Sequence, residues 1–172
     1  SRALARRFAR SLGMTMPAYR RALSALRAHL DVVERKLSAR AFGEIDYEKV
    51  PSRANLIYRT AFMERDLDRR HAYLEAVGGG EAVIRANVLF PHEIVDQYAL
   101  YPSRCDYTLE HLWKALPDNV QGGNGAIVVA DGSGSMFTPV SGHFGVQAIS
   151  VANALAIYFA ERLTGPFHDL YI

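Results

Sequence analysis

The stretch that most constrains the fold of this chain is residues 126–136, which read AIVVADGSGSM. The apolar run at residues 127–130 is long enough for one buried strand, and it stops at Asp131. Glycines alternate with the polar residues that follow, so the backbone can turn tightly there. Residues 146–163 are largely apolar and favour a helix. A strand, a short polar loop and a helix in this order predict the beginning of an α/β unit.

Asp131, Ser133 and Ser135 place one carboxylate and two hydroxyl groups on this loop. Ligands of α/β sheets bind beyond the carboxyl ends of the strands, which is where these oxygens are expected. Mg²⁺ prefers oxygen ligands in near-octahedral geometry and retains some of its water. The loop therefore predicts a site for Mg²⁺ or another divalent cation. An ordinary Gly/Ser turn is the alternative interpretation of the same residues.

The spacing around the loop excludes other glycine-rich sites. A dinucleotide-binding fingerprint requires a third glycine where Phe137 stands, and a P-loop requires a Gly-Lys-Ser/Thr sequence that is absent. An EF-hand loop that starts at Asp131 would need glycine at Met136. A hydrolase nucleophile elbow would need glycines in place of Asp131 and Ser135. We therefore expect the chain not to be an enzyme.

Composition narrows the class of protein. The chain has 172 residues, of which 49% are hydrophobic and 22% charged, as in ordinary globular proteins. The one cysteine, Cys105, excludes an internal disulfide and fits a reducing compartment, so a cytoplasmic location is expected. No apolar run reaches membrane-spanning length without polar interruption, so no membrane partner is expected.

The net charge of +2 conceals an asymmetry. Residues 1–40 hold ten basic and two acidic side chains, a net charge of +8, so the remaining residues carry −6. A basic end of this kind indicates a polyanion partner, most simply RNA. Arg20, Arg21 and Arg27 lie in a helix expected to begin near Pro17 and to continue past residue 30. They are interpreted either as a phosphate-contacting face or as a solvated helix face.

Short helices without strands are expected over residues 1–120. Helices in series suit a helical-repeat array, although no internal repeat is visible. Residues 117–125 are polar and glycine-rich, which predicts a domain boundary. The expected fold is thus an α-helical, repeat-like region at residues 1–120, followed by the start of an α/β domain at residues 121–172.

Two motifs in the helical region provide further candidates. His92-Glu93 would begin a zinc-protease motif only with a second histidine at position 96, where the sequence has Asp96. A helix-capping pair near Pro91 is expected there instead.

Arg53 lies in the turn that is expected to open a helix. Its guanidinium group is predicted either to contact RNA or to pair with Asp46 or Glu48. The pair would hold the preceding connector in place.

These motifs resemble an uncharacterised family of proteins from plants, fungi, bacteria, large viruses and phages. The resemblance is carried by residues 45–54 (IDYEKVPSRA), residues 89–95 (LFPHEIV), the DGSGSM loop and residues 165–167 (GPF). The family couples a TROVE-like helical region to a von Willebrand A-like, Rossmann-like domain. It is similar more remotely to the Ro RNA-binding autoantigen.

The resemblance implies a metal-ion-dependent adhesion site (MIDAS). Ser133 and Ser135 would contact the metal directly, and Asp131 would bind it directly or through water. A complete domain of this kind would supply a Thr and an Asp ligand beyond Ile172, so the chain is expected to be a truncated fragment. Ro-type proteins bind small noncoding RNAs through a ring of helical repeats, which implies an RNA partner.

Two functions follow as hypotheses. The first is a ribonucleoprotein component that binds RNA through Arg20, Arg21, Arg27 and Arg53, while the Mg²⁺ site captures an oxygen ligand of a protein partner. The alternative is a metal-dependent protein–protein interaction scaffold that has no role with RNA.

Overall fold

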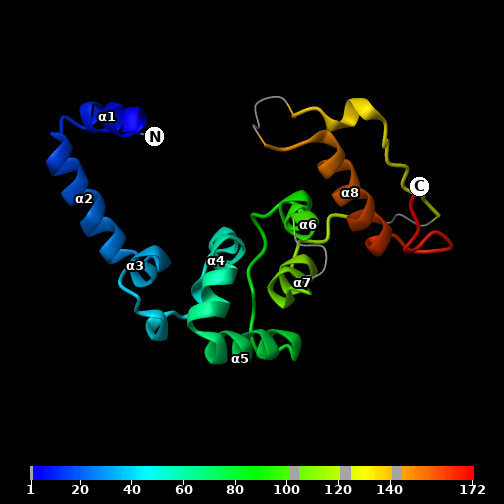
Figure 1. Cartoon of the computed structure of the whole chain (residues 1–172), viewed down its shortest axis with the longest axis horizontal. Helices are drawn as coiled ribbons and strands as arrows, with labels where there is room; N and C mark the ends of the chain where they lie inside the picture. Colours follow the sequence, from blue (N-terminus) through cyan, green and yellow to red (C-terminus); the bar gives the residue numbers. More distant parts are fainter. Residues whose placement is uncertain (1, 101–104, 121–124, 141–144) are drawn as a thin grey trace. The chain divides into compact units, whose positions relative to one another are not determined.

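The computed structural model describes residues 2–100, 105–120, 125–140 and 145–172, apart from the side chains of residues 99 and 100. The chain divides into two compact units, Ser1–Asp46 and Tyr47–Ile172, hereafter the first and the second unit. Within the described ranges, both units are built from α-helices and short 3₁₀ helices (Figure 1).

The first unit contains α1 (Arg2–Ser11), α2 (Met16–His29), α3 (Val33–Ser38) and the 3₁₀ helix η1 (Phe42–Glu44). Gly13, with φ 64°, turns the chain between α1 and α2. The Thr15 hydroxyl caps α2 by accepting a hydrogen bond from Ala18 N at 3.4 Å, and Pro17 lies in the first turn. The helix expected to continue past residue 30 is interrupted at Asp31, whose φ is 49°.

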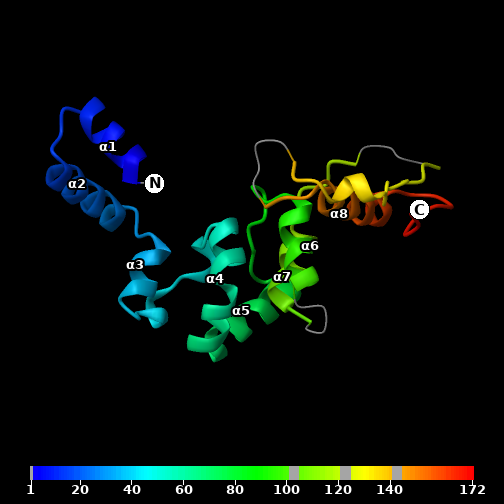
Figure 2. The ribbon, with the colours of Figure 1, turned by 45° about the horizontal axis from the view of Figure 1, so that its top comes forward.

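The second unit contains the 3₁₀ helices η2 (Tyr47–Lys49) and η3 (Gly134–Phe137) and the α-helices α4 (Ser52–Arg65), α5 (Leu67–Gly78), α6 (Pro91–Leu100), α7 (Tyr107–Lys114) and α8 (Ala148–Arg162). Helices α4, α5 and α7 contact one another, α6 contacts α7, and α8 packs against α6. Helices α6 and α7 lie side by side in both views of the ribbon (Figures 1 and 2).

The hydrophobic core of the second unit gathers side chains from all five of these α-helices and from the segment between α5 and α6. Its buried members are Leu56, Leu74, Ile84, Ala86, Leu89, Ile94, Leu109, Leu112, Trp113, Leu116 and Tyr158. Removal of this apolar surface from water supplies the main driving force for folding the unit.

Polar contacts also fix α8 to the end of α7. Trp113 Nε1 donates a hydrogen bond to the Glu161 carboxylate at 2.6 Å. The Tyr158 hydroxyl donates to the Pro117 carbonyl at 2.5 Å and accepts from Asn119 N at 2.9 Å. Helix α8 therefore belongs to the same packed unit as α6 and α7. The domain boundary expected after residue 120 adjoins residues 121–124, which lie outside the described ranges, and it stays a prediction.

A buried arginine lies between α4, α5 and α7. Arg70 of α5 is 0% exposed, and its guanidinium donates to Asn55 Oδ1 at 3.0 Å and to Thr108 Oγ1 at 3.3 Å. Three aromatic rings surround the guanidinium at 5.0–5.2 Å: Tyr47, Phe62 and Tyr73. Burial lowers the pKa of Arg70 below its ordinary value, and Nε has no hydrogen-bond partner in the described part of the chain.

The expectation of an α/β domain at residues 121–172 is wrong. Among the residues that the structure describes there is no strand and no sheet. The run at residues 127–130 forms only an isolated parallel bridge, in which Ala130 N donates to Ile172 O at 2.6 Å and Ile172 N donates to Val128 O at 2.9 Å. Val129 is 69% exposed, whereas a parallel strand requires cover on both faces.

The described helices are also too short or too polar to cross a lipid bilayer.

We expect Arg70→Ala to lower the free energy of unfolding by about 3 kcal/mol, because it removes the donor to Asn55 Oδ1 and to the Thr108 hydroxyl and opens a cavity among aromatic rings. Urea unfolding, followed by the fluorescence of Trp113, measures the change. The control is Arg65→Ala, which removes an exposed guanidinium from α4 and is expected to change stability by about 0.5 kcal/mol or less. Equal stabilities of the two variants would contradict a central role for Arg70.

Candidate functional site

The predicted metal ligands lie together on one exposed loop. Asp131 Oδ1 accepts a hydrogen bond from Ser133 N at 2.8 Å, and the hydroxyl oxygens of Ser133 and Ser135 are 3.1 Å apart. Ser133 precedes η3, and the Thr138 hydroxyl donates to the Ser135 carbonyl at 2.8 Å at the end of that turn. The loop thus presents three side-chain oxygens that a cation could share.

The electrostatics of this loop suit a weakly held cation. The hydrogen bond from the Ser133 backbone lowers the pKa of Asp131 below its ordinary value, which keeps the carboxylate ionised. All three side chains are exposed, and no group of three or more His, Cys, Asp or Glu residues in the described ranges could hold a metal ion. One carboxylate and two hydroxyls fit Mg²⁺ only if water completes its octahedral shell.

The predicted RNA contacts divide between the two units. Arg20, Arg21 and Arg27 are exposed on α2, and no hydrogen bond or ion pair engages them in the described part of the chain. Arg20 and Arg27 are seven residues apart and share a helix face, whereas Arg21 points about 100° away. Arg53 belongs to the second unit, so the α2 arginines form one candidate surface without it.

Arg53 forms an ion pair with Glu93, rather than with either of the acidic residues expected from the sequence. The other carboxylate oxygen of Glu93 accepts a hydrogen bond from Phe90 N at 3.0 Å, which confirms the expected helix-capping role at Pro91. One carboxylate therefore joins the beginning of α4 to the beginning of α6. The two motifs of residues 45–54 and 89–95 meet at this carboxylate.

A groove with a volume of about 680 Å³ lies beside the Arg53–Glu93 pair. Its floor is apolar, with Leu56 from α4 and Val151 from α8, and Asp96 adds a carboxylate one turn along α6. Sequence reasoning missed this groove because its residues come from four separate segments. The two motifs at residues 45–54 and 89–95 supply part of its lining, and they are the sequence signal that could have indicated it.

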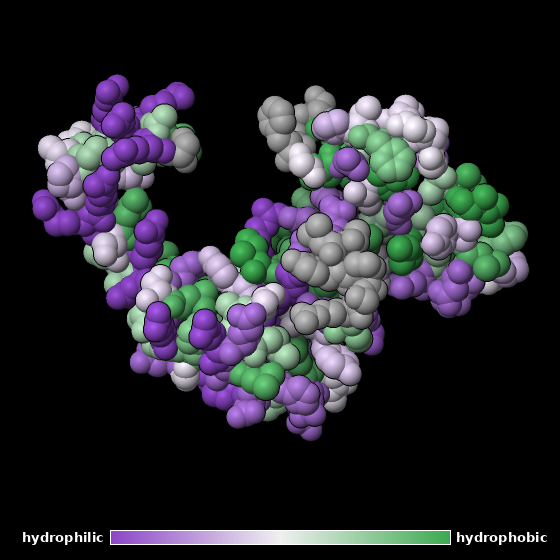
Figure 3. All heavy atoms as spheres, viewed as in Figure 1, coloured by the Kyte–Doolittle hydropathy of each residue, from purple (hydrophilic) through white to green (hydrophobic). Residues whose placement is uncertain are grey.

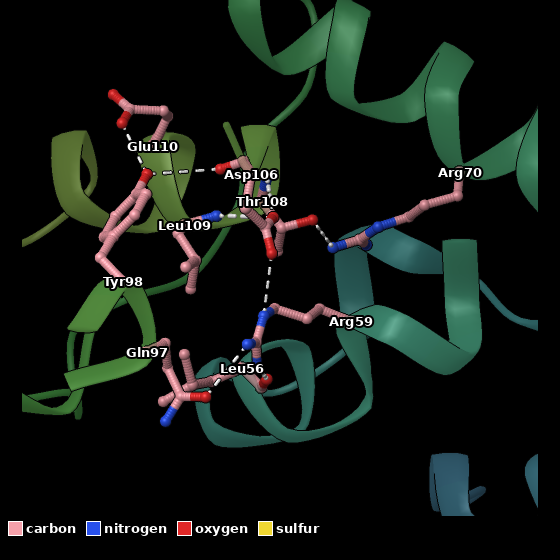
Figure 4. Close-up of polar contacts among 9 residues, drawn as sticks. All are labelled: Leu56, Arg59, Arg70, Gln97, Tyr98, Asp106, Thr108, Leu109 and Glu110. Atoms are coloured by element: carbon pink, nitrogen blue, oxygen red, sulfur yellow. Dashed lines mark hydrogen bonds and ion pairs between the residues drawn. The ribbon is translucent and has the colours of Figure 1, made fainter. Parts of the chain in front are cut away.

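A partly buried polar network joins α4, α6 and α7, and it includes Gln97 of the groove (Figure 4). Arg59 donates to Asp106 at 2.9 Å, to the Leu56 carbonyl at 2.8 Å and to Gln97 Oε1 at 3.0 Å. These three bonds fix α4 to α6 and to the start of α7. The Asp106 carboxylate also caps α7, accepting from Leu109 N at 3.3 Å.

Tyr98 of α6 extends the network to α7. Its hydroxyl donates to the Glu110 carboxylate at 2.6 Å. Burial, together with this bond, raises the pKa of Tyr98 above its ordinary value. The neutral phenol is therefore a structural donor, and the network as a whole holds α6 in position beside the groove.

We expect Glu93→Gln to lower the free energy of unfolding by about 1–2 kcal/mol. The neutral amide has one acceptor oxygen, so it cannot replace the two carboxylate oxygens that accept from Arg53 and from Phe90 N. The change is measured by urea unfolding with Trp113 fluorescence. Asp96→Asn is the matched control, since no hydrogen bond or ion pair engages Asp96 in the described residues, and its stability should stay within about 0.5 kcal/mol. An equal loss in both variants would contradict the junction assigned to Glu93.

Comparison with known proteins identifies a matching family and a relative that is much longer than this chain. Residues 6–122 match the family described as Domain of unknown function (DUF2828). The chain is 33% identical over 178 residues to uncharacterized protein L728 of Acanthamoeba polyphaga mimivirus, a match that covers 94% of this chain. It covers 29% of the viral protein, so the chain spans under a third of the length of that relative.

No solved structure matches the chain. These matches give no support to the TROVE, von Willebrand A or Ro relationships that the motifs indicated. The family match extends from α1 past the end of α7, and it includes more than half of the chain. The chain therefore belongs to the family described as Domain of unknown function, DUF2828.

Proposed function

We propose that the chain is a non-catalytic RNA-binding protein whose first unit contacts the phosphate backbone. The observation that supports this most is that Arg20, Arg21 and Arg27 are exposed and unpaired within the described residues. The whole first unit holds ten basic and four acidic side chains, a net charge of +6. Hydrophilic side chains gather over α1 and α2 on the face that Figure 3 shows.

Helix geometry supports phosphate as the ligand. Arg20 and Arg27 lie two turns apart on one face, about 10 Å along the helix axis. Each guanidinium can donate two parallel hydrogen bonds to one phosphate, and neither has to leave an ion pair to do so. As the chain spans 29% of its viral relative, the RNA partner of the whole protein is part of the proposal.

We expect a fluorescently labelled single-stranded RNA to bind the chain with an affinity that falls steeply as salt is added. Replacing Arg20, Arg21 and Arg27 with Ala should weaken binding and lower the slope of log K against log salt concentration by about 2, because each lost phosphate contact contributes about 0.7. Fluorescence anisotropy over a salt series measures both quantities.

The matched control removes the same charge from the second unit. Arg65, Arg85 and Lys114 are exposed there, and their replacement with Ala should leave the salt slope unchanged. If both triple variants lost affinity equally, binding would reflect net charge alone and the assignment to α2 would be wrong.

A second candidate function is supported by the loop at Asp131. The 3.1 Å separation of the Ser133 and Ser135 hydroxyls, beside an ionised carboxylate, favours a divalent cation that leaves coordination positions open. Such a cation would accept a carboxylate from a protein partner, as in a metal-dependent interaction scaffold. Mg²⁺ would supply positive charge and a binding position there, not chemistry.

We expect Mn²⁺, used as a paramagnetic probe, to broaden the NMR amide signals of residues 131–136 before those of other segments. Replacing Ser133 and Ser135 together with Ala should abolish this selectivity, because two of the three oxygen ligands are lost. Ser24→Ala, at an exposed serine of α2, is the control. Uniform broadening in all three proteins would show that the loop is only a turn.

A further inference from the structure

The groove beside Arg53 contains an exposed aromatic platform. The rings of Phe90 and His92 are stacked, with centroids 5.8 Å apart and planes 15° apart, and Phe90 is 62% exposed. Phe90 also lines the groove, so its exposed aromatic ring offers an apolar area to a ligand there. A flat ring is the ligand shape that such a face accepts.

The backbone that bears the platform is tied to the groove wall. Glu93 accepts a hydrogen bond from Phe90 N at 3.0 Å and pairs with Arg53, so the residue that bears the exposed ring is tied to the groove wall. Phe90 and His92 flank Pro91, the first residue of α6, where the Phe90 N–H is capped by Glu93. A preorganised platform loses little entropy when a ring stacks on it.

The polar groups of the groove have unused hydrogen-bonding capacity. No hydrogen bond or ion pair engages the Asp96 carboxylate within the described residues, and it lies in the groove one turn beyond His92. Gln97 accepts from Arg59 Nη2 through its Oε1 at 3.0 Å, which leaves its amide N–H groups for another partner. The lining of the groove therefore includes the two acceptor oxygens of the Asp96 carboxylate and the amide donor of Gln97.

We propose that this groove binds an unpaired guanine base of the RNA, an inference that rests on the RNA-binding function proposed above. The ring stacks on Phe90, the guanine N1–H and N2–H groups donate to the two oxygens of Asp96, and O6 accepts from the Gln97 amide. RNA-binding proteins read unpaired bases by stacking and by hydrogen bonds to the Watson–Crick edge in this way.

The carboxylate explains why guanine is selected over the other bases. Adenine, cytosine and uracil each present at least one ring nitrogen acceptor or carbonyl oxygen on this edge, and that atom would face the negative charge of Asp96. Leaving a buried acceptor opposite another acceptor costs binding free energy. Guanine alone offers two adjacent donors, which a carboxylate accepts together.

The charge of the groove separates its role from that of α2. Arg53 and Glu93 neutralise each other, and Asp96 adds a negative charge, so the groove does not attract phosphate. Its contribution is a preference among bases, whereas the arginines of α2 contribute salt-dependent affinity. The two roles therefore respond to different experiments.

The experiment measures anisotropy with three labelled RNAs of equal length: uridine only, the same RNA with one central guanosine, and the same RNA with one central adenosine. The guanosine RNA should bind the wild-type chain at least about fivefold more tightly than the adenosine RNA. Asp96→Asn should remove that preference without changing the salt slope. Phe90→Ala should weaken binding of both purine RNAs by roughly fivefold or more, because base stacking is lost.

Asp68→Asn is the matched control, because it makes the same change at an exposed carboxylate of α5 outside the groove. Circular dichroism of each variant checks that the helices are retained. If RNA binds with a steep salt dependence but the three RNAs are equivalent, or if Asp96→Asn keeps the preference, the groove inference is overturned while the function proposed for α2 stands.

If no RNA binds the wild-type chain, the proposed function fails, and the groove is tested with mononucleotides instead. Guanosine monophosphate should shift the NMR signals of Phe90 and His92, and adenosine monophosphate should shift them less. The same shifts with both nucleotides, or no shift with either, would overturn the inference independently of RNA binding.

Discussion

The second unit depends on the buried guanidinium of Arg70. The Arg70 guanidinium is removed from water among aromatic rings, with hydrogen bonds to Asn55 and Thr108 as its polar compensation. An isolated charge in such a place would be costly, and aromatic faces recover part of that cost through their negative quadrupole. Because Asn55, Arg70 and Thr108 come from three helices, the compensation exists only when α4, α5 and α7 are assembled. The cation therefore makes the packing of these helices cooperative.

The same assembly sets the position of the candidate site. Arg59 lies one turn beyond Asn55 on α4. Its hydrogen bonds to Asp106 and Gln97 fix the start of α7 and α6 relative to α4. Glu93 then fixes the first turn of α6 against Arg53. The groove is thus built on helices whose mutual arrangement is fixed by directional polar contacts.

Local features of the fold were predictable from the sequence, and long-range ones were not. The helix expected to begin near Pro17 is confirmed by α2, because a proline in the first turn acts within a few residues. The break at Asp31 depends on the φ of one residue, and no neighbouring pattern announces it. The strand expected at residues 127–130 was wrong because an apolar run specifies burial but not the partner that provides it.

For the candidate site, the sequence indicated the oxygens of the Asp131 loop, the arginines of α2 and the capping role of Glu93. It could not indicate that Arg59 and Arg70 are buried, since an arginine between apolar helix positions usually faces solvent. The partner of Arg53 was missed for a related reason. Glu93 is 40 residues away along the chain, and only the packing of α4 beside α6 brings the two together.

The isolated bridge between Val128 and Tyr171 has a consequence for handling the protein. Large apolar side chains around it are exposed: Val129, Phe137, Leu170, Tyr171 and Ile172. Extended backbone beside such side chains is a template for further strand pairing. These exposed apolar residues should therefore promote self-association of the chain in solution. The positive charge of the first unit repels other copies of the chain and slows that association.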